Sequence, residues 1–180
     1  ESNTTGSQNC GLGRAALNAN TTGNYNVGVG YGSVNSTTAN YNTGVGYRAL
    51  GNCTTGAGNV AVGSDCLLSN TTGASNTVVG TSAMDSLTTG VQNTAVGYQA
   101  GGAQTTAVSN TLVGYLAADY QNNLTTGSDN VVIGAYARTA AATTIESVNI
   151  GRYVLGQGST TITLGVNGNG VSIPANNSTT

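Results

Sequence analysis

The stretch "NTAVGYQA", residues 93–100, recurs along the chain with few changes. Related stretches begin at Asn26, Asn42, Asn59, Asn76 and Asn110. The glycine that closes each stretch returns at a nearly constant spacing, at Gly13, Gly30, Gly46, Gly63, Gly80, Gly97, Gly114, Gly134, Gly151 and Gly165. A Thr-Thr pair that starts five residues before each Asn keeps the same spacing. Because two separate markers stay in step, the chain is an array of short repeats that stack on their neighbours.

The short period, mostly 17, predicts an all-β fold, a parallel β-solenoid of about ten coils. Helical-pair repeats need about 33 residues or more, and Gly, Asn, Thr and Val are weak helix formers. We expect two short strands and two turns in each coil, with coils about 4.8 Å apart. Residues 1–151 are predicted to form the regular coils. Residues 152–180 are predicted to form irregular coils and a C-terminal cap or transition segment, because the spacing before Gly165 falls to 14.

Alternation along each strand predicts which side chains face the interior of the coil. The residue before the glycine is aliphatic in every coil, as in Val79 and Val96, and we expect it and the residue two places earlier to fill the interior. The small residue three places after the glycine, such as Ala83, and the larger one that follows it, such as Met84, are also expected inside. The repeated Asn can stack as an amide ladder.

The middle strand position is predicted to face outward and to form an oligomer interface. Its residues are small or apolar and never charged: Gly11, Gly28, Gly44, Ala61, Val78, Ala95, Leu112 and Val132. A strand that is apolar on both faces is usually covered on both faces. The chain is therefore expected to associate with itself about its long axis; a threefold arrangement, a homotrimer, would fit, although the column itself does not fix the number of partners. The alternative is that this column simply gives a smooth sheet facing solvent.

Tyrosines supply the candidate ligand contacts. Tyr31, Tyr47, Tyr98 and Tyr115 follow the repeated glycine, and exposed rings beside Asn and Thr would suit a cell-surface glycan or receptor. The alternative is that these rings pack at the corners and shield the coil edges.

Composition argues against several other functions. Four Arg and no Lys give no basic surface for nucleic acid, and no apolar run approaches the ~18 residues of a membrane span. Without His, the common nucleophilic systems are missing, so we expect no enzyme, no catalytic residues, no metal site and no cofactor. One carboxylate pair, Asp85 and Asp119, lies two coils apart, at about 9.6 Å by strand spacing, near the upper limit for inverting glycosidases. A polysaccharide-degrading spike is therefore kept as an alternative.

The repeats resemble those of known attachment proteins. The stretches Asn59-Val60-Ala61-Val62-Gly63 and Asn93-Thr94-Ala95-Val96-Gly97 resemble repeats of phage and giant-virus tail or surface fibres, and are similar to the head repeats of trimeric autotransporter adhesins. The resemblance covers about residues 3–151 and implies a left-handed parallel β-roll that trimerises and serves attachment. It places the chain outside the cell, in a virion fibre or on a cell surface. The adhesin units are shorter than the repeats of this chain, so the turns must differ. A filament subunit stacked end to end on other fibre segments, without receptor binding, is the other alternative.

Overall fold

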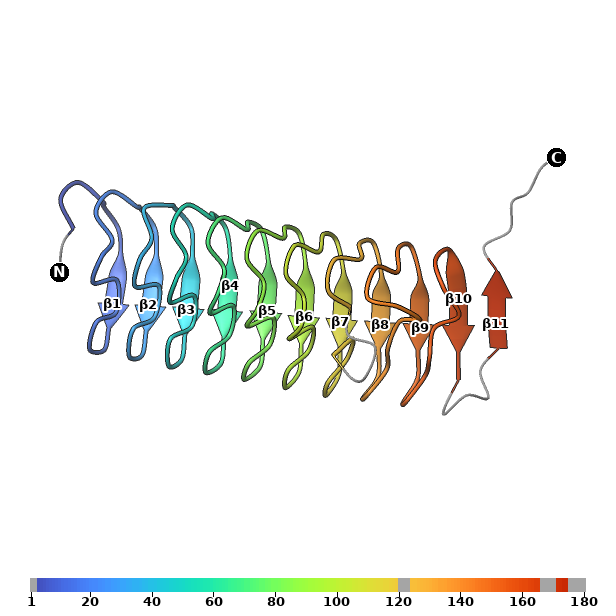
Figure 1. Cartoon of the computed structure of the whole chain (residues 1–180). Helices are drawn as coiled ribbons and strands as arrows, with labels where there is room; N and C mark the ends of the chain where they lie inside the picture. The colour runs from blue at the N-terminus through green and yellow to red at the C-terminus, as the bar shows by residue number, and fades with distance from the viewer. Residues whose placement is uncertain (1–2, 120–123, 166–170, 175–180) are drawn as a thin grey trace.

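The computed structural model describes residues 3–119, 124–165 and 171–174, and every regular element in them is a β-strand. The strands are β1 (Cys10–Leu12), β2 (Val27–Val29), β3 (Thr43–Val45), β4 (Val60–Val62), β5 (Thr77–Val79), β6 (Thr94–Val96), β7 (Thr111–Val113), β8 (Val131–Ile133), β9 (Val148–Ile150), β10 (Thr161–Leu164) and β11 (Val171–Pro174). They lie side by side in chain order in one sheet along an elongated molecule (Figure 1).

Parallel pairing from β1 to β10 confirms the β-solenoid. Equivalent repeat positions pair directly, so that Val78 lies beside Ala95 and Ala95 lies beside Leu112. The structure departs from the prediction in the content of each coil: it assigns one strand, not two, to a coil in the described residues. β10 continues the parallel stack into the segment predicted to be irregular. β11 pairs antiparallel with β10 and ends the run of parallel strands.

Left-handed residues shape the rest of each coil. Non-glycine residues have φ between 46° and 62° at three recurring positions: two and four places after the repeated glycine, and one place before the repeated Asn. Leu67, Met84 and Gln92 are examples. A left-handed residue other than Gly or Asn costs roughly 1–2 kcal/mol. Backbone hydrogen bonds between coils offset this cost, as in the Leu67 N–H to the Ala83 carbonyl at 3.1 Å.

The direction predicted for the strand residues is wrong. Of the middle residues predicted to meet a partner, all but one are buried within the chain's own coil: Gly28, Gly44, Ala61, Val78, Ala95, Leu112 and Val132. The exception is Gly11 in the first coil, which is exposed. The aliphatic residues predicted to fill the interior face outward instead, and Val79 and Val96 are 37% and 39% exposed.

The interior is narrow behind β3, and this explains the glycine in the middle of that strand. A side chain at Gly44 would place its Cβ 2.6 Å from Cγ2 of Val34 and 2.8 Å from the carbonyl oxygen of Ala49. The opposite wall of the coil therefore lies directly behind the strand. Val78, in contrast, is larger, and it is as fully buried as Met84 on that wall. Small strand residues make room for the chain's own far wall rather than for a second chain.

The corner residues predicted to face the core do so. The small column from Ala16 to Ala137 is buried throughout, as are the larger residues that follow it in the first five coils, from Leu17 to Met84. Most of these side chains belong to one continuous hydrophobic cluster that runs along the solenoid.

The predicted amide ladder is confirmed. The Oδ1 of Asn76 accepts hydrogen bonds from the backbone N–H and the Nδ2 of Asn93, both at 3.0 Å. The Nδ2 of Asn76 donates to the Oδ1 of Asn59 and to the carbonyl of Gly90. The backbone N–H to Oδ1 link repeats from Asn9 to Asn130 and ends on Ser147, whose hydroxyl donates to Asn130. Each Asn thus ties its coil to both neighbours.

The Thr-Thr pairs form a second inter-coil contact. In most pairs the first threonine donates from its hydroxyl to a carbonyl of the next coil, as Thr71 does to Thr88 at 3.2 Å and Thr88 to Thr105 at 3.0 Å; in the Thr37–Thr38 pair the second threonine does so. The second threonine, such as Thr72 or Thr89, is exposed. This corner therefore fixes the stack with one residue and leaves the other in solvent.

Candidate functional site

The first and third strand residues form a continuous surface, which we call the outer sheet face. It consists of the residues at the first position, namely Cys10, Val27, Thr43, Val60, Thr77, Thr94, Thr111, Val131 and Val148, and those at the third position, namely Leu12, Val29, Val45, Val62, Val79, Val96, Val113, Ile133 and Ile150. None carries a charge, and all are exposed or half-buried. A parallel sheet normally has both faces covered. In this single chain, one face packs on the coil interior and the other is open.

The predicted glycan-contact tyrosines are partly exposed and stack on each other. The rings of Tyr31 and Tyr47 lie 5.4 Å apart between centroids, and those of Tyr98 and Tyr115 lie 5.2 Å apart. Each of the four is 44–47% exposed. Tyr25 and Tyr41 form a third stacked pair at 5.0 Å. The stacking agrees with the interpretation that the rings pack along the corner, and contact with a glycan stays a prediction.

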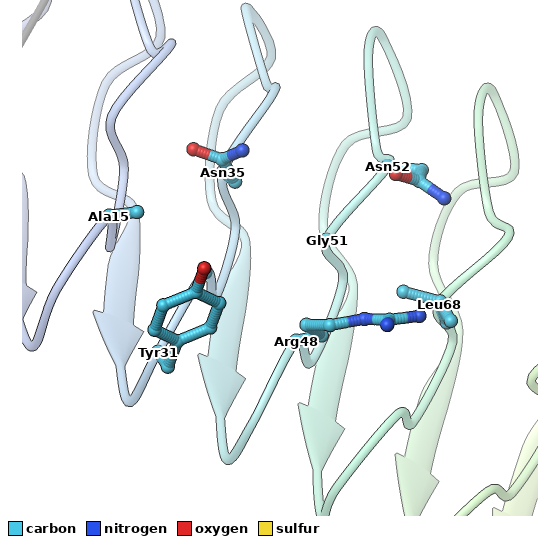
Figure 2. A pocket seen from close by; sticks show the side chains of 8 residues that line it. Ala15, Tyr31, Asn35, Arg48, Gly51, Asn52 and Leu68 are labelled. Atoms are coloured by element: carbon cyan, nitrogen blue, oxygen red, sulfur yellow. The ribbon is translucent and has the colours of Figure 1, made fainter.

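A groove of about 210 Å³ lies beside one of these pairs, on the corner that follows β2 and β3. We call it the Tyr31 groove. Figure 2 shows the Tyr31, Asn35, Arg48 and Asn52 side chains around it. Its remaining lining comes from Ala15, Gly32, Gly51 and Leu68. The sequence interpretation included Tyr31 and missed the other residues, because the repeat pattern does not show that neighbouring coils contribute to one hollow.

The carboxylate pair is partly buried, and Asp119 is tied to the backbone. Its Oδ1 accepts a hydrogen bond from the Ala103 N–H at 2.9 Å. Burial raises the pKa of Asp119 to about 6, the Ala103 hydrogen bond opposes this rise, and repulsion from Asp85 adds to it. Burial likewise raises the pKa of Asp85. The contact with Ala103 gives Asp119 a structural role between two coils.

Stability is expected to rise as the pH falls from 7 to about 5. The folded-state pKa of Asp119, about 6, lies above the roughly 3.9 of an unfolded Asp. The folded state therefore binds the proton more tightly, and stability is lost as the pH rises through this window. We expect the thermal midpoint to be higher at pH 5 than at pH 7, and this difference to shrink in Asp119→Asn, whose amide oxygen can still accept from Ala103. An unchanged difference in Asp119→Asn would assign the pH effect to other groups.

The cysteines are free thiols in different surroundings. Cys66 stands three places after the repeated Gly63, a position predicted to face the core; it is buried, and burial raises its pKa to about 12. Cys53 is buried too, and its thiol donates to the Gly56 carbonyl. Cys10 was predicted inside but is exposed, because the first strand position faces outward.

Across residues 3–119, 124–165 and 171–174, no three His, Cys, Asp or Glu side chains gather in a way that could hold a metal ion. The same residues contain no helix with the length and apolar character of a membrane span.

Comparisons with protein-family models, curated proteins and solved structures give no match to this chain.

Proposed function

We propose that the chain is a structural and adhesive fibre segment that assembles side by side with copies of itself and mediates attachment to a host or another surface. The observation that carries the proposal is the outer sheet face, which is uncharged and largely aliphatic or threonine-lined from β1 to β9. A large exposed apolar surface commonly marks an interaction site. The corrected strand direction moves the proposed interface from the middle column to this face.

The elongated shape suits a fibre. The coils are linked along the axis by the amide ladder and the Thr contacts, so the rod does not depend on a large globular core. Three rods packed through their outer sheet faces would cover the apolar residues and leave the tyrosine corners exposed. The resemblance to viral fibre and adhesin repeats supports a homotrimer, an extracellular location and a receptor or glycan as the partner. Stacking on other fibre segments would extend the same rod.

Solution mass tests the assembly. We expect the native species to have three times the 17.7 kDa mass of the chain. In the double variant Val79→Lys with Val96→Lys, charges on the outer sheet face should convert this species to monomer with an unchanged circular dichroism spectrum. The matched control, Thr72→Lys with Thr89→Lys, places the same charges on the exposed Thr corner and should stay trimeric. A wild-type protein that is monomeric at micromolar concentration would contradict the assembly proposal.

Attachment is tested separately by glycan-array and cell-binding measurements on the assembled protein. Binding by wild type and by the Thr72→Lys/Thr89→Lys control, with weaker binding by the monomeric variant, would support a multivalent adhesive role, because linked sites gain avidity. A correctly assembled trimer that binds no array glycan and no cell surface would favour a filament subunit without receptor binding.

A further inference from the structure

We propose that the Tyr31 groove binds a carboxylated sugar residue, through hydroxyl contacts to Asn35, Asn52 and Tyr31 and a carboxylate contact to Arg48. The inference deepens the attachment role proposed above and rests on it. It assigns a specific site and a ligand class, whereas the outer sheet face concerns assembly alone.

The groove lies where two neighbouring coils have a glycine, and the open space is at Gly32. Gly32 stands at the left-handed position two places after the repeated glycine, where other coils carry Arg48, Asp65, Ser82 or Gln99. Gly51, in the next coil, stands at the position that Asn35 and Leu68 occupy in the coils beside it. A Cβ on Gly32 would meet only Cγ of Arg48, at 3.6 Å, so the space above it is open. The hollow is therefore particular to these coils and not a general feature of the repeat.

The polar groups around the groove have unused hydrogen-bonding capacity. The Oδ1 of Asn35 is buried without a hydrogen-bond partner, which is costly; it is closed to solvent in this conformation, so a ligand in the groove would contact the Nδ2 of Asn35, or the Oδ1 after the amide turns. Tyr31 has one ring face against the Arg14 guanidinium at 5.7 Å and the other against Tyr47, so its edge and hydroxyl are what it offers a ligand. Asn52 is exposed and adds a second amide. Convergent amides and a phenol, with the Leu68 side chain as an apolar contact, suit a polyhydroxylated ring.

Charge favours an acidic ligand. Arg48 pairs through Nε with Oδ1 of Asp65 at 3.2 Å, which orients the guanidinium and leaves its terminal nitrogens for other acceptors. Arg14 stands at the other side of Tyr31. Residues 14–68, which include the whole lining of the groove, contain two Arg and one Asp, Asp65, and so carry a net charge of +1 (two positive minus one negative), whereas the whole chain has a net charge of −2. The groove thus lies in the positive part of an otherwise acidic molecule, and Arg is well suited to binding carboxylates.

The size of the groove limits the ligand. About 210 Å³ is smaller than the roughly 300–1,000 Å³ of sites that enclose drug-sized molecules. One sugar ring with its carboxylate is the expected occupant, and the remainder of a longer glycan would extend along the exposed corner. The lining residues all follow the strands, so the groove is separate from the outer sheet face.

The test uses the assembled protein and four small probes followed by NMR: the methyl glycosides of glucuronic acid and N-acetylneuraminic acid, methyl glucoside, and acetate. We expect amide shifts at Gly32, Asn35 and Gly51 with at least one acidic glycoside, and at least about tenfold weaker binding of methyl glucoside and of acetate. Equal binding of acetate would overturn the saccharide assignment, and equal binding of methyl glucoside would overturn the requirement for a carboxylate.

Two variants and a control locate the site. Gly32→Gln should abolish binding by filling the groove, and it should fold because Gln99 occupies the same coil position with φ of 49°. Arg48→Gln should weaken the acidic glycoside about tenfold or more and leave methyl glucoside unchanged. Ser82→Gln adds the same side chain at the equivalent position outside the groove and should bind like wild type. Undiminished binding by folded Gly32→Gln would overturn this site even if array binding had already supported attachment.

Discussion

Gly63→Ala is expected to lower the free energy of unfolding by about 3–5 kcal/mol, because the position tolerates no side chain. Gly63 has φ of +140°, and a Cβ there would lie 2.5 Å from the carbonyl oxygen and 2.6 Å from the carbonyl carbon of Gly80 in the next coil. Both atoms belong to the backbone, so no side-chain rotation can relieve the overlap. The stack would have to separate between the coils of β4 and β5.

Urea unfolding followed by circular dichroism measures this loss, and Gly32→Ala is the matched control. Gly32 is also left-handed, with φ of +61°, but has open space around it, and Ala15 and Ser82 adopt φ of 60° and 52° at equivalent positions. We therefore expect Gly32→Ala to lower the free energy of unfolding by only about 1 kcal/mol. Hydrogen exchange should also accelerate near β4 and β5 in Gly63→Ala, since each coil is stabilised by its neighbours. Equal losses in the two variants would mean that close coil contact at Gly63 is unimportant.

Asn76→Ala should also lower the free energy of unfolding by about 3–5 kcal/mol, because it leaves buried polar groups without hydrogen-bond partners. The Asn93 N–H would lose its acceptor, the Asn76 Oδ1 at 3.0 Å, and the Gly90 carbonyl would lose its donor, the Asn76 Nδ2 at 2.9 Å. Each unpaired buried group is worth roughly 1–3 kcal/mol. The same urea titration gives the measurement.

Two further variants separate the ladder from a general effect of removing an amide. Asn18 is exposed and lies outside the ladder, so Asn18→Ala should change stability by no more than about 0.5 kcal/mol. Asn76→Asp keeps an acceptor for Asn93 but places a carboxylate against the Asn59 Oδ1 and the Gly90 carbonyl. The decrease in the free energy of unfolding of Asn76→Asp should be large at pH 7. It should be smaller at acidic pH, where the protonated carboxyl can donate a hydrogen bond again. An Asn76→Ala variant as stable as Asn18→Ala would show that the ladder contributes little.

Only part of the candidate groove could be predicted from the sequence. Tyr31 was identifiable as a candidate exposed ring because it follows the repeated glycine. Gly32 and Gly51 looked like further repeat glycines, and only the stacking of their coils shows that both line one hollow. No sequence pattern marked Arg48 as a groove residue, since its place beside Tyr31 depends on how the next coil stacks.

By itself the sequence determined the period, the parallel solenoid, the buried corner residues such as Ala83 and Met84, and the Asn ladder. Each of these follows from a residue type that recurs at one spacing, and stacking must bring such residues together. The tertiary structure alone decided which strand face is inside. Alternation in a three-residue strand separates the middle residue from its neighbours but does not say which side is the interior. At Gly44 the closeness of Val34 and Ala49 leaves no room for a side chain, whereas Val78 and Leu112 are fully buried at the same strand position, so the packing of each coil against its own far wall made that choice.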